Sequence, residues 1–159
     1  MNSSNRGAIF YFYSVIKRYT LGKNERLKSR KVIEQLFKEG KKFNLLPFRV
    51  FYLLENKIPG DQQPISKNSG INIQFGVGVS SKNFKKAVDR NRIKRQSREA
   101  WRLQKHDIAG LLSNKSKHLS VFFIYTPKES SDFQTIYGKT GLIINKLAKL
   151  IHETDTSTT

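Results

Sequence analysis

Between residues 71 and 80, apolar side chains alternate without a break with small or polar ones, and so regular a pattern leaves the chain few folds. The apolar set is Ile71, Ile73, Phe75, Val77 and Val79, and the intervening set is Asn72, Gln74, Gly76, Gly78 and Ser80. A period of two places successive side chains on opposite faces of a strand, so this segment is predicted to be a strand with one buried face. Gly76 and Gly78 on the other face would let another backbone or a nucleic-acid strand approach closely.

The flanking segments predict further helices and strands. Residues 29–40 have apolar side chains at helical spacing and end at Gly40, where a left-handed residue is expected to close the helix. Residues 48–54 and 119–125 are short apolar runs rich in aromatic and β-branched side chains, which is typical of strands. A last helix is expected to begin at Ser131, because this serine and the glutamine three positions later match a capping box.

The predicted order is helix, strand, strand, helix, strand, helix, and one further strand within residues 41–54 cannot be separated from its neighbour. We therefore expect an α/β (α+β sandwich) fold in which a small central sheet of about four strands packs with three helices. A chain of 159 residues has the size of one domain. We assign residues 1–20 to a flexible N-terminal extension, residues 21–152 to a single domain with a surface loop at 55–70, and residues 153–159 to a disordered tail.

Residues 82–105 contain ten basic side chains and only two acidic ones, Asp89 and Glu99. On a helical wheel of about 100° per residue, this segment separates into a core arc and a polar arc. The core arc holds Ile93, Ser97, Ala100, Trp101 and Gln104, and the opposite arc holds Asn91, Lys94, Arg95, Arg98 and Arg102. Like charges four residues apart repel each other, so a helix keeps such a stripe where a polyanion neutralises it.

A solvated surface is the ordinary explanation for a charged helix face, but three features favour nucleic acid here. Acidic partners at i,i+4 are nearly absent, arginine is preferred, and Asn91 stands among the arginines. The planar guanidinium of arginine suits phosphate. An asparagine can cap a turn or hydrogen-bond a base or ribose edge, and the sequence leaves both roles open for Asn91.

The overall charge points to the same class of partner. Thirty Lys and Arg against twelve Asp and Glu give a net charge of +18 and a pI near 10.3, which indicates a polyanionic partner. The absence of cysteine excludes a disulfide framework and a thiolate zinc site, and three scattered histidines make an all-histidine metal site unexpected. The apolar stretch at residues 8–16 is too short to span a membrane. We expect a cytoplasmic protein with no membrane partner.

Two strings of residues carry a resemblance to a known family. Residues 75–82 read Phe-Gly-Val-Gly-Val-Ser-Ser-Lys, and residues 87–102 read Ala-Val-Asp-Arg-Asn-Arg-Ile-Lys-Arg-Gln-Ser-Arg-Glu-Ala-Trp-Arg. Together they resemble the protein subunit of bacterial ribonuclease P. Residues 26–28 and 36–40 are similar to the opening of that family, and the resemblance extends over residues 20–150.

The resemblance implies a fold and two binding surfaces. It implies a left-handed crossover between parallel strands, against the usual right-handed rule. It implies that the basic helix binds a large catalytic RNA, and that a cleft beside the first helix and the sheet holds the single-stranded 5′ leader of precursor tRNA. The residues implied for the catalytic RNA are Arg90, Asn91, Arg92, Lys94, Arg95, Arg98 and Arg102, and those implied for the leader cleft are Phe37, Phe51, Ile33 and Lys82. Ile33 stands where relatives often have a second phenylalanine.

The same resemblance assigns the hydrolysis to the RNA subunit with its bound magnesium, so the protein itself is expected to hold no cofactor, no metal and no catalytic residue. No obligate protein partner is inferred. The rival interpretations are a protein-only nuclease, for which clustered acids or histidines are missing, and a ribosomal or other structural RNA-binding protein. From the residues alone, Phe37 and Phe51 fit a core better than stacking platforms for single-stranded RNA, and only the resemblance favours the platforms. Lys82 is placed to meet a phosphate, although an exposed lysine at the end of a strand usually has no such role.

Overall fold

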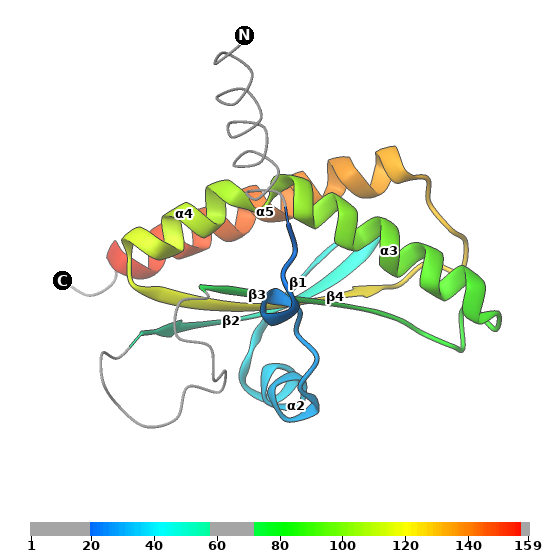
Figure 1. The fold of residues 1–159 in the computed structure, drawn as a ribbon, viewed down its shortest axis with the longest axis horizontal. Coiled ribbons are helices and arrows are strands. Elements are labelled where there is room, and N and C mark those ends of the chain that lie inside the picture. The colour runs from blue at the N-terminus through cyan, green and yellow to red at the C-terminus, as the bar shows by residue number, and fades with distance from the viewer. Residues whose placement is uncertain (1–19, 58–71, 157–159) are drawn as a thin grey trace, which may run out of the picture.

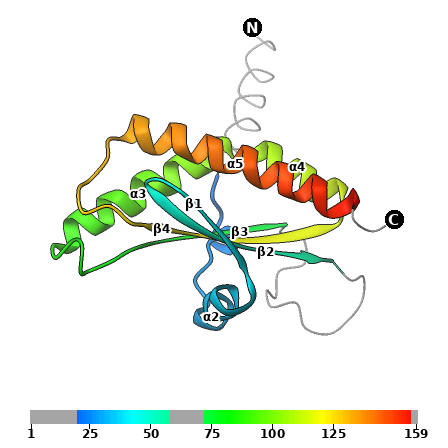
Figure 2. The ribbon, with the colours of Figure 1, turned by 180° about the vertical axis from the view of Figure 1, so that it is seen from behind.

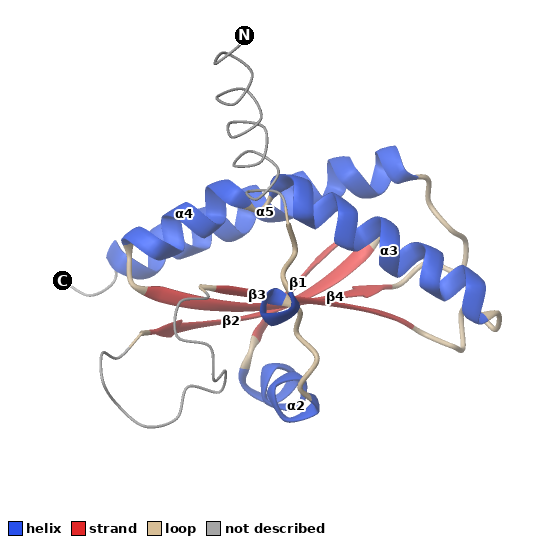
Figure 3. Ribbon diagram, in the orientation of Figure 1, coloured by secondary structure: helices blue, strands red, loops and turns tan. Residues whose placement is uncertain are grey.

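The structure is a computed structural model that describes residues 20–57 and 72–156. The predicted N-terminal extension up to residue 19, the loop residues 58–71 and the last three residues lie outside this range. Ile71, the first residue of the alternating segment, is among them. The described residues form one sheet with helices on both of its faces (Figure 3).

The sheet has four strands in the order β1-β2-β4-β3. β1, β2 and β4 are antiparallel neighbours, and β3 runs parallel to β4. The single apolar run after residue 41 is a hairpin, because Leu46 and Pro47 form a turn between two strands. The strands are β1 (Lys41–Leu45), β2 (Phe48–Asn56), β3 (Ile73–Val79) and β4 (Lys117–Tyr125).

Of the described α-helices, three pack on one face of the sheet and one packs on the other, and the views from the front and from behind agree with this (Figures 1 and 2). We call these the covered face and the open face. The helices of the covered face are α3 (Ala87–Gln104), α4 (His106–Asn114) and α5 (Phe133–Thr156), and the helix of the open face is α2 (Arg30–Glu39), which follows the short helix η1 (Lys23–Glu25). The expected α+β fold with a four-stranded sheet is confirmed. The hand of the crossover from β3 to β4 stays a prediction.

The main core lies between the sheet and the three helices of the covered face. Trp101 of α3 is completely buried, and its ring stacks on Phe75 of β3 at a centroid distance of 4.5 Å and an interplanar angle of 7°. The edge of Phe123 from β4 meets the same indole at 5.7 Å. Ile73, Phe75 and Val77 of β3 are buried in this core, as the alternation predicts. The prediction of one buried face is wrong, however, because Gln74 and Gly76 on the other face are buried as well.

The described residues form four α-helices rather than the expected three, because residues 106–114 form α4 instead of a plain connection. The segment is short, and the sequence pattern was too brief to distinguish a helix from a loop. Ile108 and Leu112, one turn apart, are completely buried and anchor α4 to the sheet. The crossover between β3 and β4 therefore contains two consecutive helices.

The predicted left-handed conformation of Gly40 is wrong, and so are two predicted boundaries of the last helix. Gly40 ends α2 with an extended backbone, φ −71°, and the reason for glycine is space, since a Cβ there would lie 2.3 Å from the Leu36 carbonyl oxygen. The N-terminus of α5 is capped by Asp132, whose Oδ1 accepts the Thr135 N–H at 2.9 Å. Ser131 is instead held by the Tyr125 hydroxyl, which accepts its N–H at 2.8 Å. At the far end, α5 continues to Thr156, so residues 153–156 belong to the helix and not to a disordered tail.

Candidate nucleic-acid interfaces

The basic helix has the two faces that its sequence predicts. Ile93, Ser97, Ala100 and Trp101 are buried against the sheet. On the outer side Asn91, Arg92, Arg95 and Arg98 are exposed, and Lys94 is half-buried. Asn91 is the fifth residue of α3, which begins at Ala87 with Lys86 as its N-cap, so Asn91 does not cap this helix.

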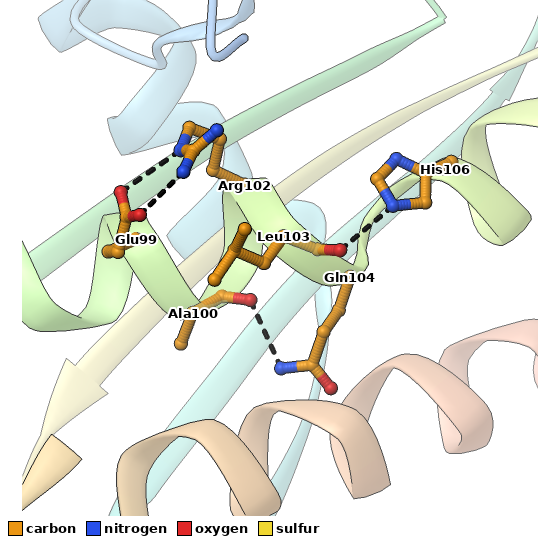
Figure 4. Close-up of polar contacts among 6 residues, drawn as sticks. All are labelled: Glu99, Ala100, Arg102, Leu103, Gln104 and His106. Carbon is orange, nitrogen blue, oxygen red and sulfur yellow. Dashed lines mark hydrogen bonds and ion pairs between the residues drawn. The ribbon is translucent and has the colours of Figure 1, made fainter. Parts of the chain in front are cut away.

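Two of the predicted RNA-binding arginines also have partners within the protein. The Nη1 of Arg90 donates to the carbonyl oxygens of Phe84 and Lys85, both at 2.7 Å, and so closes the loop before α3. Arg102 forms a bidentate pair with Glu99, at 3.0 Å from Nε and 2.5 Å from Nη2 (Figure 4). This hydrogen bond lowers the pKa of Glu99 and raises that of Arg102. Among the basic residues of α3, Arg102 therefore has an acidic partner, Glu99, three residues before it.

The last turn of α3 is fixed to its surroundings by side chains. Gln104 donates to the Ala100 carbonyl at 3.1 Å, and the His106 ring contacts the Leu103 carbonyl at 2.8 Å (Figure 4). Gln104 also donates to the Tyr137 carbonyl of α5 at 3.0 Å. These contacts join α3 to α4 and α5. The arginines of α3 are thus carried by a helix that is held at its C-terminal end by two neighbouring helices.

A pocket of about 220 Å³ opens beside the middle of α3. We call it the arginine pocket, and it is lined by Leu21, Arg26, Arg95, Arg98, Glu99 and Arg102. Partial burial, with a smaller effect from the positive charge of Arg26, lowers the pKa of Arg98. Four guanidinium groups with one carboxylate make a site that favours an anion. The sequence analysis gave Arg26 no role, although residues 26–28 carried part of the family resemblance.

On the open face, three phenylalanines form a cluster that we call the aromatic patch: Phe37 of α2, Phe51 of β2 and Phe122 of β4. The ring centroid of Phe37 lies 4.8 Å from that of Phe51 and 5.3 Å from that of Phe122, with the latter pair edge to face. Phe37 is 42% exposed, and the other two rings are half-buried. Phe37 and Phe51 are therefore brought together, as the resemblance implied.

The strand register places two rings of the aromatic patch in one cross-strand row, with a second row beside it. Lys42 pairs with Phe51, Phe51 with Phe122, and Phe122 with Gly76. In the next row Asn44 pairs with Arg49, Arg49 with Ile124, and Ile124 with Gly78. Because residues two apart share a face, Lys42 and Arg49 lie on the same face as the aromatic rings, and both are exposed.

Phe122 is a candidate site residue that the sequence analysis missed. A Cβ on Gly76 would lie 2.6 Å from the Phe122 ring, and a Cβ on Gly78 would lie 3.1 Å from it. The two glycines thus make room for this ring, and the predicted close approach is by a side chain of β4. The available signal was the paired Phe122 and Phe123, of which a strand must place one on each face.

The two remaining predicted cleft residues have different positions. Ile33 is half-buried and packs in the small cluster of Leu27, Val32 and Leu36, together with Phe51 and Phe122. It therefore lies beside the aromatic patch. Lys82 is exposed in the turn that follows β3, and its N–H donates to the Ser80 hydroxyl at 3.2 Å.

Among residues 20–57 and 72–156, no three His, Cys, Asp or Glu side chains gather closely enough to hold a metal ion. Within the same residues, none of the helices combines the length and the apolar character that crossing a membrane requires.

The sequence of residues 21–148 matches the family described as ribonuclease P. The chain belongs to the ribonuclease P protein family. The ribonuclease P protein component of Porphyromonas gingivalis is 36% identical over 118 residues, which cover 74% of this chain and 79% of that protein. The resemblance stated from the two residue strings is therefore confirmed.

Solved structures of this family have the same fold. RNase P protein from Staphylococcus aureus superimposes with a TM-score of 0.56 at 23% identity, covering 81% of this chain and 99% of that one. RNase P protein from Thermotoga maritima gives a TM-score of 0.55 at 26% identity, covering 77% of this chain and 96% of that one. The exposed arginines of α3, Arg92, Arg95 and Arg98, form what we call the arginine face. This face and the aromatic patch both lie within the residues that match the ribonuclease P family.

Proposed function

We propose that this protein is the RNA-binding protein subunit of a ribonuclease P, and that it assists a catalytic RNA in removing the 5′ leader of precursor tRNA. The observation that carries the proposal is the pair of surfaces within the family-matched residues. An arginine face on α3 and an aromatic patch beside α2 lie on opposite sides of one sheet. Opposite placement would allow two RNA molecules to bind at once.

The outer face of α3 is the proposed contact with the catalytic RNA. Arg92, Arg95 and Arg98 are exposed on one rigid helix, and arginine can pair with phosphate through two parallel hydrogen bonds. Each phosphate that is neutralised releases counterions, so binding should weaken steeply with salt. Asn91 is exposed among them and is proposed to contact a base or ribose edge.

The aromatic patch is the proposed contact with the leader. Single-stranded RNA is held by stacking its bases on aromatic rings beside a basic groove, and each stack contributes about 1–3 kcal/mol. Phe37 offers an exposed ring, with Phe51 and Phe122 supporting it. Lys42 and Arg49 supply positive charges on the same face. Lys82 is proposed to bind a phosphate further along the RNA.

The chemistry is proposed to belong to the RNA subunit and its bound magnesium, with the protein inactive by itself. Water activation for phosphodiester cleavage needs a metal cluster or a matched acid and base. The proposed role of the protein is therefore to bind and position the two RNAs.

A reconstitution experiment tests the proposal. Precursor tRNA is incubated with the cognate catalytic RNA at low magnesium, with and without the protein, and 5′ cleavage is followed on a gel. We expect the protein to increase kcat/KM with the RNA present and to give no cleavage without it. Magnesium-dependent cleavage by the protein alone would contradict the assignment of catalysis, and no response of the RNA to the protein would favour a purely structural RNA-binding role.

The leader site is tested in the same assay with Phe37→Ala, because Phe37 is the most exposed ring of the patch. The substrate series has leaders of increasing length, from one nucleotide upward. We expect Phe37→Ala to weaken binding of long-leader substrates by roughly 5- to 100-fold, which corresponds to one stacking contact, and to leave the shortest leader unaffected. Leu46→Ala, at an exposed turn outside the patch, is the matched control.

A further inference from the structure

The segment before α2 runs along the free edge of β3. The Leu27 N–H donates to the Phe75 carbonyl at 2.9 Å, and Arg26 forms an isolated parallel bridge with Phe75. Gln74 Nε2 donates to the Asn24 carbonyl at 3.2 Å. These contacts fix the backbone on both sides of Arg26, whose side chain lines the arginine pocket with those of α3.

A buried ion pair attaches the same segment to the end of the basic helix. Lys105 Nζ pairs with Glu25 Oε1, and the lysine side chain is only 5% exposed. The second carboxylate oxygen of Glu25 accepts the Gly22 N–H at 2.6 Å. Lys105 is the residue between α3 and α4, and its N–H donates to the Trp101 carbonyl at 3.0 Å. The pair therefore joins two segments that are 80 residues apart in the sequence.

Stability alone is a weak explanation for this pair, because the desolvation cost of a buried ion pair often cancels its attraction. The charges around Arg26 supply a better one. Arg26 faces Arg95, Arg98 and Arg102, and the one acid that lines the pocket, Glu99, is already paired with Arg102. Repulsion among these guanidinium groups favours a position of the Arg26 segment farther from α3, and both the backbone contacts to β3 and the Glu25–Lys105 pair oppose that displacement.

We propose that Glu25 and Lys105 are a positioning pair, which holds Arg26 against the arginines of α3 and so completes a pocket for one phosphate group. The phosphate belongs either to the backbone of a bound RNA, an assignment that rests on the proposed function, or to a free anion in solution. In both cases Glu25, although negative, acts in favour of anion binding.

The test with RNA uses the expectation that removing the negative charge of Glu25 weakens RNA binding, although removing a negative charge ordinarily strengthens it. Glu25→Gln and Glu34→Gln each remove one negative charge. Glu34 is an exposed residue of α2 that pairs with Arg30, one helical turn before it. If charge alone mattered, both variants would bind the catalytic RNA slightly more tightly. The proposal predicts instead that Glu25→Gln weakens binding by about 3- to 10-fold while Glu34→Gln does not.

A double-mutant cycle separates positioning from a general loss of fold. Arg26→Gln alters an exposed side chain and should lower the slope of log K against log salt by about 0.9. Because Glu25 acts through Arg26, the variant with both changes should bind no more weakly than Arg26→Gln alone. Additive losses would overturn the proposal. If Glu25→Gln does not fold, Lys105→Gln takes its place in the same cycle.

The free-anion arm uses inorganic phosphate without any RNA. Phosphate at constant ionic strength should raise the melting temperature of the parent and of Glu34→Gln more than chloride does. The extra stabilisation should be lost in both Arg26→Gln and Glu25→Gln. If the variants lose both the stabilisation by phosphate and affinity for the catalytic RNA, the pocket is assigned to the RNA backbone. If they lose only the stabilisation by phosphate, the pocket is assigned to a free anion. Glu25→Gln behaving like Glu34→Gln in both arms overturns the proposal.

The two proposals fail separately. If the parent protein does not stimulate cleavage of precursor tRNA, the proposed function fails, but the phosphate arm still tests the pocket. If the parent stimulates cleavage and Glu25→Gln behaves like Glu34→Gln, the positioning pair fails while the function stands.

Discussion

The two faces of the sheet are built very differently. The covered face buries twenty residues in one cluster under α3, α4 and α5, with Trp101 at its centre. The apolar cluster of the open face has three buried members among the described residues, Leu27, Val32 and Leu36, because the ten-residue helix α2 is too short to cover this face. Aromatic rings next to α2 therefore stay in contact with water, at a cost that an unused surface has no reason to carry.

This difference separates stability from binding within one small domain. The covered face supplies the core that holds α3 in place, so that its outer arginines are presented on a rigid element. The open face buries less apolar surface and leaves aromatic rings and cations in contact with water. A side chain that points to one face should therefore matter for folding, and its neighbour in the same strand should matter for RNA.

The sharpest test compares one aromatic residue from each face. Trp101→Ala empties the centre of the covered face and should lower the free energy of unfolding by about 3–5 kcal/mol. Phe122→Ala removes a half-buried ring from the open face and should cost less, about 1–2 kcal/mol, while weakening leader binding. Urea denaturation and leader-dependent cleavage measure the two effects. Equal losses of stability would contradict the comparison.

A second test displaces the Phe122 ring of the open face without removing it. The new methyl group of Gly76→Ala would collide with the Phe122 ring at 2.6 Å, so we expect a loss of about 1–3 kcal/mol and displacement of the ring from Phe37. Gly138→Ala in α5 is the matched control, because nothing lies within 4 Å of its added Cβ. The control should stabilise the protein by about 0.5–1 kcal/mol, since alanine favours a helix. Thermal unfolding distinguishes the two signs.

A third test addresses the outer surface of α3. Arg95→Ala and Arg98→Ala should each lower the slope of log K against log salt for the catalytic RNA by about one unit. Asn91→Ala should lower affinity with little change in slope, because a neutral amide releases no counterion. Arg90→Ala should lower stability as well, since Arg90 holds the carbonyls of Phe84 and Lys85. Unchanged slopes for all three arginines would make this a solvated surface.

The smallest expected effect is a pH dependence on the open face. Burial, with a smaller contribution from Lys57, lowers the pKa of His118 below its ordinary value of 6.5, although the Glu55 carboxylate lies 3.9 Å away. The unfolded chain then binds the proton more readily, so the free energy of unfolding should fall as the pH drops below about 6.5. Urea denaturation of the parent and of His118→Gln at several pH values isolates this contribution. A parallel pH dependence in both proteins would contradict it.

Much of the covered face follows from local patterns. The alternation in β3 and the 3.6-residue period of α3 each assign side chains to one side of a single element, without reference to its neighbours. For that reason the buried set of Phe75, Ile93 and Trp101, the outer arginines, and the family itself were predictable from residues 75–102. The prediction failed where a local pattern was short or ambiguous. The short helix α4 was expected to be a connection, and Ser131 was expected to cap α5 where Asp132 does.

The open face and the arginine pocket depend on the tertiary structure. Phe122 and Phe123 are identical in sequence terms, and only the register of β4 between β2 and β3 decides that Phe122 lies over the two glycines. Arg26 reaches Arg95 and Arg98 only because its segment runs along the edge of β3, and Glu25 meets Lys105 across 80 residues. The sequence by itself determined which side of each element is apolar or charged, since that depends on backbone periodicity. Which of these sides come together depended on strand pairing and helix packing, which are contacts between residues far apart in the chain.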